Sequence, residues 1–139
     1  MLNKRVYLAG PIFGKADAEC MGWRMDAAHW LRLRGFKPVD PMRRDYRGRE
    51  DICPEKIVSQ DQEDIFSCGY MLANANAPSW GTAMELVYGR ATDCSVVAFA
   101  TFANSPAISP WLRQYTDAIY ESLDHALAGI ASGSTKGMR

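Results

Sequence analysis

The sequence predicts a single α/β domain built on a doubly wound, mostly parallel sheet. Four short apolar runs typical of buried strands alternate with segments of helical spacing, in the order β, α, β, α, β, α, β. A chain of 139 residues is long enough for one such domain and too short for two. Its 16 basic and 16 acidic residues balance. This balance favours a pocket for a small molecule over a general surface for nucleic acid or membranes.

The first strand is predicted at Arg5–Ala9, where an apolar run stops at Gly10. The loop 10–14 would then follow the carboxyl end of a strand, which is the edge where open α/β sheets bind ligands. Tyr7 alternates with two apolar neighbours that point to the opposite face. Its hydroxyl could therefore reach a pocket, although a place in the core is an equal alternative.

A helix is expected from about Asp17 to Arg34, ended by Gly35, and a second strand at 36–39. On this helix we expect Met21, Ala28 and Leu31 to be buried and Arg24, Arg32 and Arg34 to face solvent. The loop 43–51 carries four arginines, which could cover an anionic ligand or form an ordinary solvated loop.

The second half of the chain continues the alternation. The expected elements are a helix at 54–67, a strand at 69–73, a turn at 78–82 that begins the next helix, a strand at 95–100, a short helix at 111–115 and a last helix at 122–130. We place the domain at residues 1–131 and a frayed tail at 132–139.

Glu85 is the carboxylate that stands out along the chain. It lies one turn inside the helix that follows 78–82, and two of its four same-face neighbours are glycines, Gly81 and Gly89. A carboxylate flanked by residues without side chains suits the floor of a cleft. The alternative from this stretch alone is a solvent-exposed helical glutamate.

No metal site or organic cofactor is expected. The four cysteines show no CxxC spacing, and the two histidines, His29 and His125, receive no catalytic role. We expect Cys68 and Cys94 to be small core residues in a reducing, cytoplasmic compartment. The N-terminus resembles neither a signal peptide nor a membrane anchor.

Four motifs together resemble the nucleoside 2-deoxyribosyltransferase superfamily, over nearly the whole length up to about Ile130. They are VYLAGPIF at 6–13, RGFKP at 34–38 after a tryptophan-containing helix, DQEDI at 61–65 and GTAMELVYGRA at 81–91. The resemblance implies a flavodoxin-like (Rossmann-like) domain that assembles as a homodimer or larger oligomer and acts on a small nucleoside or nucleotide.

The resemblance also implies three catalytic residues. Glu85 is the expected nucleophile at the anomeric carbon, where a carboxylate can stabilise or capture an oxocarbenium-like state. Asp61 matches an aspartate that protonates the departing base or holds it in place, and Tyr7 matches a tyrosine that orients the nucleophile.

Within the superfamily, Ser79 favours the branch that hydrolyses deoxynucleoside 5′-monophosphates. The transferases usually carry an acidic residue six positions before the nucleophile, where this chain has Ser79 in PSWGTAME. A hydroxyl and helix N-terminal amides can donate to a phosphate, whereas a carboxylate would repel it. Ser109 resembles the residue by which that branch reaches a neighbouring subunit's phosphate.

The substrate-binding residues expected from this resemblance come from the first loop, the first helix and the Glu85 helix. They are Gly10, Ile12, Phe13, Gly14, Arg24, Ser79, Gly81 and, from a neighbouring subunit, Ser109. Lys15 and the loop 43–49 are alternative phosphate ligands, and Trp23 is a candidate to stack on the base or to lie in the core.

We therefore predict a hydrolase that releases a free base and a sugar 5-phosphate from a nucleoside 5′-monophosphate. One alternative is a transferase that exchanges bases on free 2′-deoxynucleosides. A second is a nucleotide-binding domain without catalysis, which the joint presence of Tyr7, Asp61 and Glu85 disfavours because burying a carboxylate is costly.

Overall fold

A five-stranded, all-parallel sheet forms the centre of the protein in this computed structural model, which describes residues 3–51 and 53–133. The strands, in chain order, are β1 (Arg5–Ala9), β2 (Lys37–Val39), β3 (Tyr70–Asn74), β4 (Ser95–Phe99) and β5 (Ala118–Tyr120). Their order in the sheet is β2-β1-β3-β4-β5, which is the flavodoxin-like order. The predicted fold class is confirmed, with every strand pair parallel.

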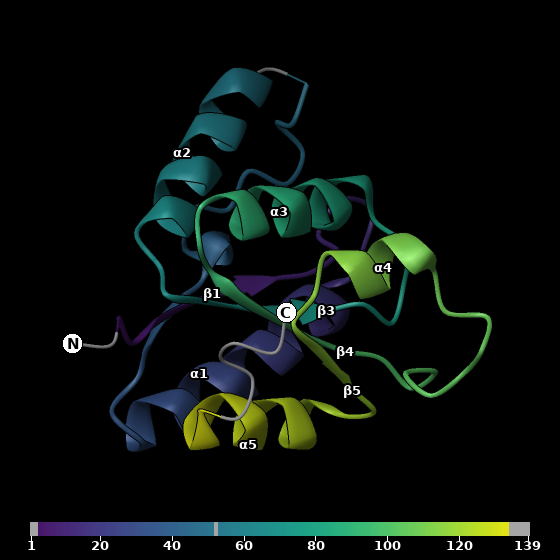
Figure 1. Ribbon diagram of the computed structural model, residues 1–139. Coiled ribbons are helices and arrows are strands. Elements are labelled where there is room, and N and C mark those ends of the chain that lie inside the picture. Colours follow the sequence, from purple (N-terminus) through teal and green to yellow (C-terminus); the bar gives the residue numbers. More distant parts are fainter. Residues whose placement is uncertain (1–2, 52, 134–139) are drawn as a thin grey trace.

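Helices cover both faces of the sheet (Figure 1). They are α1 (Trp23–Leu33), α2 (Pro54–Phe66), α3 (Trp80–Ala91), α4 (Pro110–Gln114) and α5 (Leu123–Ser132), with a short π-helix at Ala18–Gly22 and a 3₁₀ turn at Pro41–Arg43. The helices α2, α3 and α4 lie over one face, and α1 and α5 lie over the other. No helix among the described residues is long and apolar enough to cross a membrane.

Two apolar clusters, one on each face, follow from the period-2 alternation of the strands. Val6 and Leu8 of β1 pack beneath the sheet with α1 and α5, while Tyr7 and Ala9 pack on the α3 side. The predicted orientation of Tyr7, opposite to its neighbours, is thus correct. Because Tyr7 pairs with Met71 of β3 and Val39 of β2, it lies at an interior position of the sheet.

Two sequence-based expectations about the first helix are wrong. Arg24 is completely buried instead of facing solvent, and Met21 is 36% exposed instead of buried. The helix also begins with a π-helical turn, which rotates the face presented to the sheet relative to a regular α-helix. Ala28, Leu31, Arg32 and Arg34 lie as expected.

The strand β5 was missed by the sequence reading. It has only three residues, all of them half-buried at the edge of the sheet, so it lacks the long apolar run that marks β4. The last helix extends to Ser132, two residues beyond its expected end. Of the expected tail, residues 134–139 lie outside the described part of the chain.

Candidate active site

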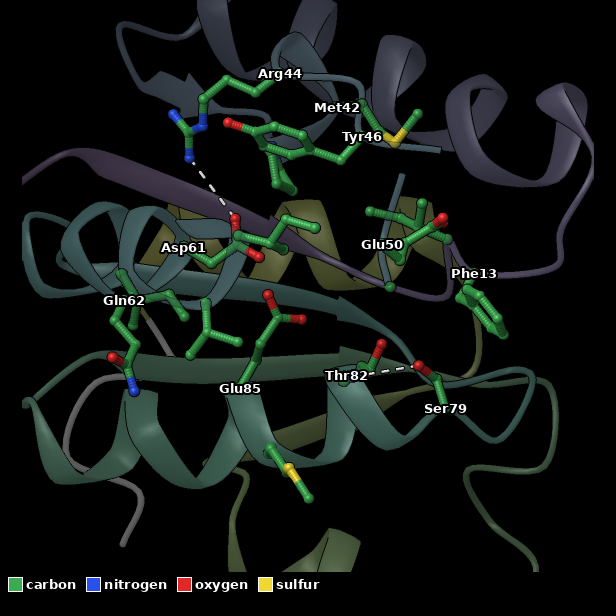
Figure 2. A pocket seen from close by; sticks show the side chains of 18 of the residues that line it. Phe13, Met42, Arg44, Tyr46, Glu50, Asp61, Gln62, Ser79, Thr82 and Glu85 are labelled. Carbon is green, nitrogen blue, oxygen red and sulfur yellow. Dashed lines mark hydrogen bonds and ion pairs between the residues drawn. The ribbon is translucent and has the colours of Figure 1, made fainter. Parts of the chain in front are cut away.

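A cavity of about 370 Å³ is lined by residues of α2 and α3 and of the loops that follow the carboxyl ends of β1, β2 and β3. Seven of the residues predicted for the site line it: Gly10, Ile12, Phe13, Asp61, Ser79, Gly81 and Glu85. Figure 2 shows the Glu85 side chain on α3 pointing toward Asp61 on α2, with Ser79 at the other end of the cavity. Segments far apart in the sequence therefore converge on one hollow.

Tyr7 of β1 orients the carboxyl of Glu85 through a hydrogen bond. Its fully buried hydroxyl donates a hydrogen bond of 2.5 Å to Oε2 of Glu85. Burial, followed by the neighbouring negative charge of Glu85, raises the pKa of Tyr7 well above 10, so the hydroxyl keeps its proton at neutral pH. The phenol is thus a permanent donor that fixes one carboxylate oxygen of Glu85 and leaves the other available to a ligand.

The half-buried Glu85 carboxyl is harder to ionise than an ordinary glutamate. Burial raises its pKa from 4.5 to about 7, an effect increased by Asp61 and opposed by the hydrogen bond from Tyr7 and by the charge of Arg24. Glu85 thus has a pKa near neutral pH, faces a cavity and is oriented by a buried donor. This arrangement is expected of a reactive group.

The pKa of Asp61 is also raised, but the nearby guanidinium of Arg44 opposes the increase. Burial raises its pKa from 3.8 to about 6, while Arg44, whose Nη2 lies 3.6 Å from Oδ1 of Asp61, favours the charged form. The same Nη2 lies 2.5 Å from Oδ2 of Asp64, which anchors Arg44 to α2. Arg44 thus offsets part of the effect of burial on the pKa of Asp61 and favours the charged form, which accepts hydrogen bonds.

Ser79 begins α3 as its N-cap. Its Oγ accepts a hydrogen bond of 3.3 Å from the backbone N–H of Thr82, and this leaves the hydroxyl hydrogen available to a ligand. The first N–H groups of a helix have no partner within it. With Gly81 in the first turn, this end of the cavity offers several donors and suits an anion.

Gly10 is required where β1 turns into the cavity loop. A Cβ at this position would lie 2.8 Å from Cζ2 of Trp23 and 3.2 Å from Cβ of Asn74. Trp23 itself packs edge-to-face on Phe99, with ring centroids 5.4 Å apart, and does not line the cavity. Of its two anticipated places, the core is the one it occupies, whereas the Phe13 ring is exposed at the cavity.

Arg24 hydrogen-bonds the backbone where β1 ends and this loop begins. Its guanidinium donates to the carbonyl oxygens of Leu8 at 3.2 Å, Cys20 at 2.6 Å and Gly10 at 2.9 Å, and its Nε lies 3.8 Å from Asp40. The side chain does not line the cavity, contrary to its predicted contact with substrate. Arg24 instead fixes the carbonyl groups at the end of β1 and adds positive charge behind Glu85.

Replacing Arg24 by methionine is expected to lower the free energy of unfolding by about 3 kcal/mol, because three carbonyl groups lose a buried, charged donor. Urea denaturation measures the change. Arg32→Met on the exposed face of the same helix is the matched control and should change stability little. Equal stability of the two variants would contradict the anchoring role of Arg24.

Gly14 and Ser109 do not line the cavity of their own chain. Gly14 has a φ of 73°, so it serves the turn that follows Phe13. Ser109 caps the exposed helix α4, accepting a hydrogen bond from the N–H of Trp111 at 3.2 Å. Lys15 likewise lies outside the cavity lining.

The loop after β2 supplies a cavity wall whose detail the sequence reading did not predict. Its arginines were anticipated, and two of them, Arg44 and Arg47, line the cavity, but both are paired with aspartates. The unanticipated lining residues with polar side chains are Tyr46, Glu50, Gln62, Thr82 and Tyr88. Of these, only Thr82 and Tyr88 had a signal in the sequence, because both share a helical face with Glu85.

No group of three or more His, Cys, Asp or Glu side chains arranged to hold a metal ion occurs within residues 3–51 and 53–133. The cavity lining carries the carboxyls of Glu50, Asp61 and Glu85, together with guanidinium, phenol and hydroxyl groups.

Comparison with known proteins gives a consistent result. The sequence model of the family described as "Nucleoside 2-deoxyribosyltransferase" matches residues 6–129. No curated protein sequence matches the chain.

Three solved structures share the fold. A CMP N-glycosidase of Clostridium botulinum is 19% identical with a TM-score of 0.62, covering 91% of this chain and 98% of its own. A 2-deoxyribosyltransferase of Bacillus psychrosaccharolyticus is 19% identical, with a TM-score of 0.67 and coverage of 87% and 88%. A 2-deoxyribosyltransferase of Leishmania mexicana is 18% identical, with a TM-score of 0.67 and coverage of 93% and 97%.

Proposed function

The chain belongs to the nucleoside 2-deoxyribosyltransferase family of enzymes, and we propose that it hydrolyses the N-glycosidic bond of a nucleoside 5′-monophosphate. The products are a free base and a sugar 5-phosphate. The observation that carries the proposal is the Tyr7–Glu85 pair, a buried phenol that orients a carboxyl of raised pKa at the floor of a cavity.

In the proposed first step the free oxygen of ionised Glu85 forms a bond to C1′ while the bond from C1′ to the base nitrogen breaks. The electron pair of that bond leaves with the base, which takes up a proton. Water then attacks C1′, gives up a proton to solvent that balances the one the base took up, and releases the Glu85 carboxylate, so the two steps regenerate the enzyme. The hydrogen bond from Tyr7 stays in place and keeps the attacking oxygen oriented.

Asp61 holds the base in this scheme. Because Arg44 favours its ionised form, Asp61 can accept a hydrogen bond from an N–H group on the edge of the base. Between the two functions anticipated for this residue, proton donor and holder of the base, its surroundings favour the second.

Ser79 supports a phosphorylated substrate. A residue six positions before Glu85 that offers a hydroxyl at a helix N-terminus can donate to a 5′-phosphate. Arg44 and Arg47 line the cavity in ion pairs with aspartates, and Nε of Arg44 has no hydrogen-bond partner among the described residues. Further donors from outside this chain would complete the subsite.

We therefore propose a homodimer in which Ser109 reaches the neighbouring active site. It is exposed, caps α4 and lies outside its own cavity. Large apolar side chains on α3 and α4 are exposed: Trp80 of α3 is 85% exposed, Met84 of α3 65% and Trp111 of α4 71%. An exposed apolar surface of this kind is typical of an interface. Light scattering should give about twice the 15.5 kDa of one chain, and a monomer would contradict the shared site.

The alternative activity is transfer of 2-deoxyribose between bases, which two of the three structural relatives are named for. Both activities use Glu85, and they differ in whether water or a second base resolves the glycosyl-enzyme intermediate. We also propose a reducing, cytoplasmic location, because the four cysteines of the sequence show no CxxC spacing.

Chromatography of reactions with ribo- and deoxynucleoside 5′-monophosphates, and with the matching nucleosides with and without an acceptor base, separates the two. We expect release of base from the monophosphates and little reaction of the nucleosides, because Ser79 and the α3 amides are the proposed phosphate ligands. Base exchange on free nucleosides, with the monophosphates inert, would refute the hydrolase and establish the transferase.

A further inference from the structure

Thr82 has a buried hydroxyl with no hydrogen-bond partner. The residue is 5% exposed and lines the cavity, yet its Oγ1 contacts no donor or acceptor among the described residues. Figure 2 shows the oxygen of Thr82 on the cavity side of α3. Only the backbone N–H of Thr82 is used by the helix cap, in its bond to Ser79.

An unpaired hydroxyl at this depth is costly to the folded protein. Leaving a buried donor or acceptor without a hydrogen bond destabilises the folded protein, so such a group calls for an explanation. The apolar isostere valine would occupy the same space without that cost. A ligand that completes the hydrogen bond supplies the missing partner.

The position of Thr82 on α3 indicates which part of a ligand it would meet. Ser79, Thr82 and Glu85 follow one another at intervals of three residues. Each interval corresponds to a rise of about 4.5 Å along an α-helix. Thr82 therefore lies between the donors proposed for the 5′-phosphate and the carboxylate proposed to attack C1′, which is the level of the furanose ring.

The stereochemistry of the reaction sets the face of the sugar that meets α3. In a displacement at C1′ the nucleophile approaches from the side opposite to the departing base. Since Glu85 is on α3, this helix must lie under the face of the furanose that is remote from the base. The 2′- and 3′-hydroxyls of a β-nucleotide point to that same face.

We propose that Thr82 is a specificity-determining residue whose hydroxyl hydrogen-bonds the 2′- or 3′-hydroxyl of the substrate sugar. The inference deepens the proposed function and rests on it. Thr82 touches neither Tyr7 nor Asp61 through any hydrogen bond in the structure, so its contribution is to sugar recognition and not to orienting the nucleophile.

The test compares Thr82→Val with wild type on a nucleoside 5′-monophosphate and on its 2′-deoxy and 3′-deoxy analogues. Removing the partner hydroxyl from the sugar should lower kcat/KM of wild type about 10-fold more than that of Thr82→Val, a comparison that cancels the effect of the hydroxyl on the reactivity of C1′ itself. Thr82→Val should lose the same factor on the intact substrate and nothing further on the analogue that lacks the partner hydroxyl. The analogue that shows this pattern identifies the 2′- or the 3′-hydroxyl.

Thr82→Ser keeps the hydroxyl and should restore discrimination between the sugars. Thr92→Val, at the far end of α3, where the hydroxyl bonds the carbonyl of Tyr88 at 3.0 Å, is the matched control and should keep the wild-type pattern. If Thr82→Val loses the same factor on all three sugars, or none on any of them, the inference is overturned while the proposed function stands. If wild type cleaves no nucleotide at all, the proposed function fails first and the inference falls with it.

Discussion

Glu85→Gln is expected to reduce release of base by about 10⁴-fold or more, because the amide cannot form the bond to C1′ that the carboxylate forms. Substrate binding should persist, since glutamine keeps the shape of the side chain and can still accept the hydrogen bond from Tyr7. Turnover is measured by chromatography and binding by calorimetry. Glu55→Gln, on the exposed start of α2 and outside the cavity, is the matched control with expected wild-type turnover.

The stability of the Glu85→Gln variant separates lost chemistry from lost folding. The folded-state pKa of Glu85 is raised, so between about 4.5 and 7 the folded protein binds more protons than the unfolded chain. This difference makes the contribution of Glu85 to stability fall as pH rises through that window. The neutral glutamine avoids it, so the variant should melt at least as high as wild type at pH 8. A variant that unfolds, or one that turns over normally, would contradict the assigned role.

Asp61→Asn is expected to lower kcat/KM by about 10²-fold, because a neutral amide is a weaker acceptor for the N–H group of the departing base than a carboxylate is. Arg44 keeps its ion pair with Asp64 at 2.5 Å, so the wall of the cavity should stay in place. The matched control is Asp124→Asn in the first turn of α5, on the opposite face of the sheet, which should retain wild-type kcat/KM.

The pH profile of kcat/KM tests the protonation state behind this prediction. Activity of the wild type should rise with pH through about 6 and 7, where Asp61 and Glu85 lose their protons. The negative charge of Asp61 raises the pKa of Glu85, so removing it should move the remaining acidic limb to lower pH in Asp61→Asn. A wild-type profile that instead falls above pH 6, with the fall abolished in the variant, would make Asp61 the proton donor.

Much of the fold could be predicted because its signals are local. The strand β4 is a continuous buried run, and alternation in β1 separates Tyr7 from its neighbours. The strand β5 could not be predicted, because three half-buried edge residues leave no periodic pattern. The burial of Arg24 could not be predicted for another reason. Its partners are the carbonyl groups of Leu8 and Gly10, and nothing in the sequence of the helix indicates them.

The candidate site divides in the same way. Motifs spread along the chain predict Glu85, Asp61 and Tyr7, and the fold brings Glu85 and Asp61 to one cavity with Tyr7 hydrogen-bonded to Glu85. The wall contributed by Tyr46 and Glu50 had no such signal, because a loop without periodicity gives no indication of the side on which it packs. The place of Thr82 in the cavity lining, by contrast, could have been predicted from the sequence, since Thr82 shares a helical face with Glu85.

The covalent state of Glu85 during turnover is the most direct test of the central claim. We would incubate the enzyme with a 5′-monophosphate whose sugar carries a 2′-fluoro substituent in the arabino configuration, which slows release of the glycosyl group by destabilising the oxocarbenium-like state. Peptide mass spectrometry of the quenched reaction should find the sugar phosphate on Glu85. An enzyme that releases base from the natural nucleotide yet carries the adduct on another residue, or none at all, would contradict Glu85 as the nucleophile.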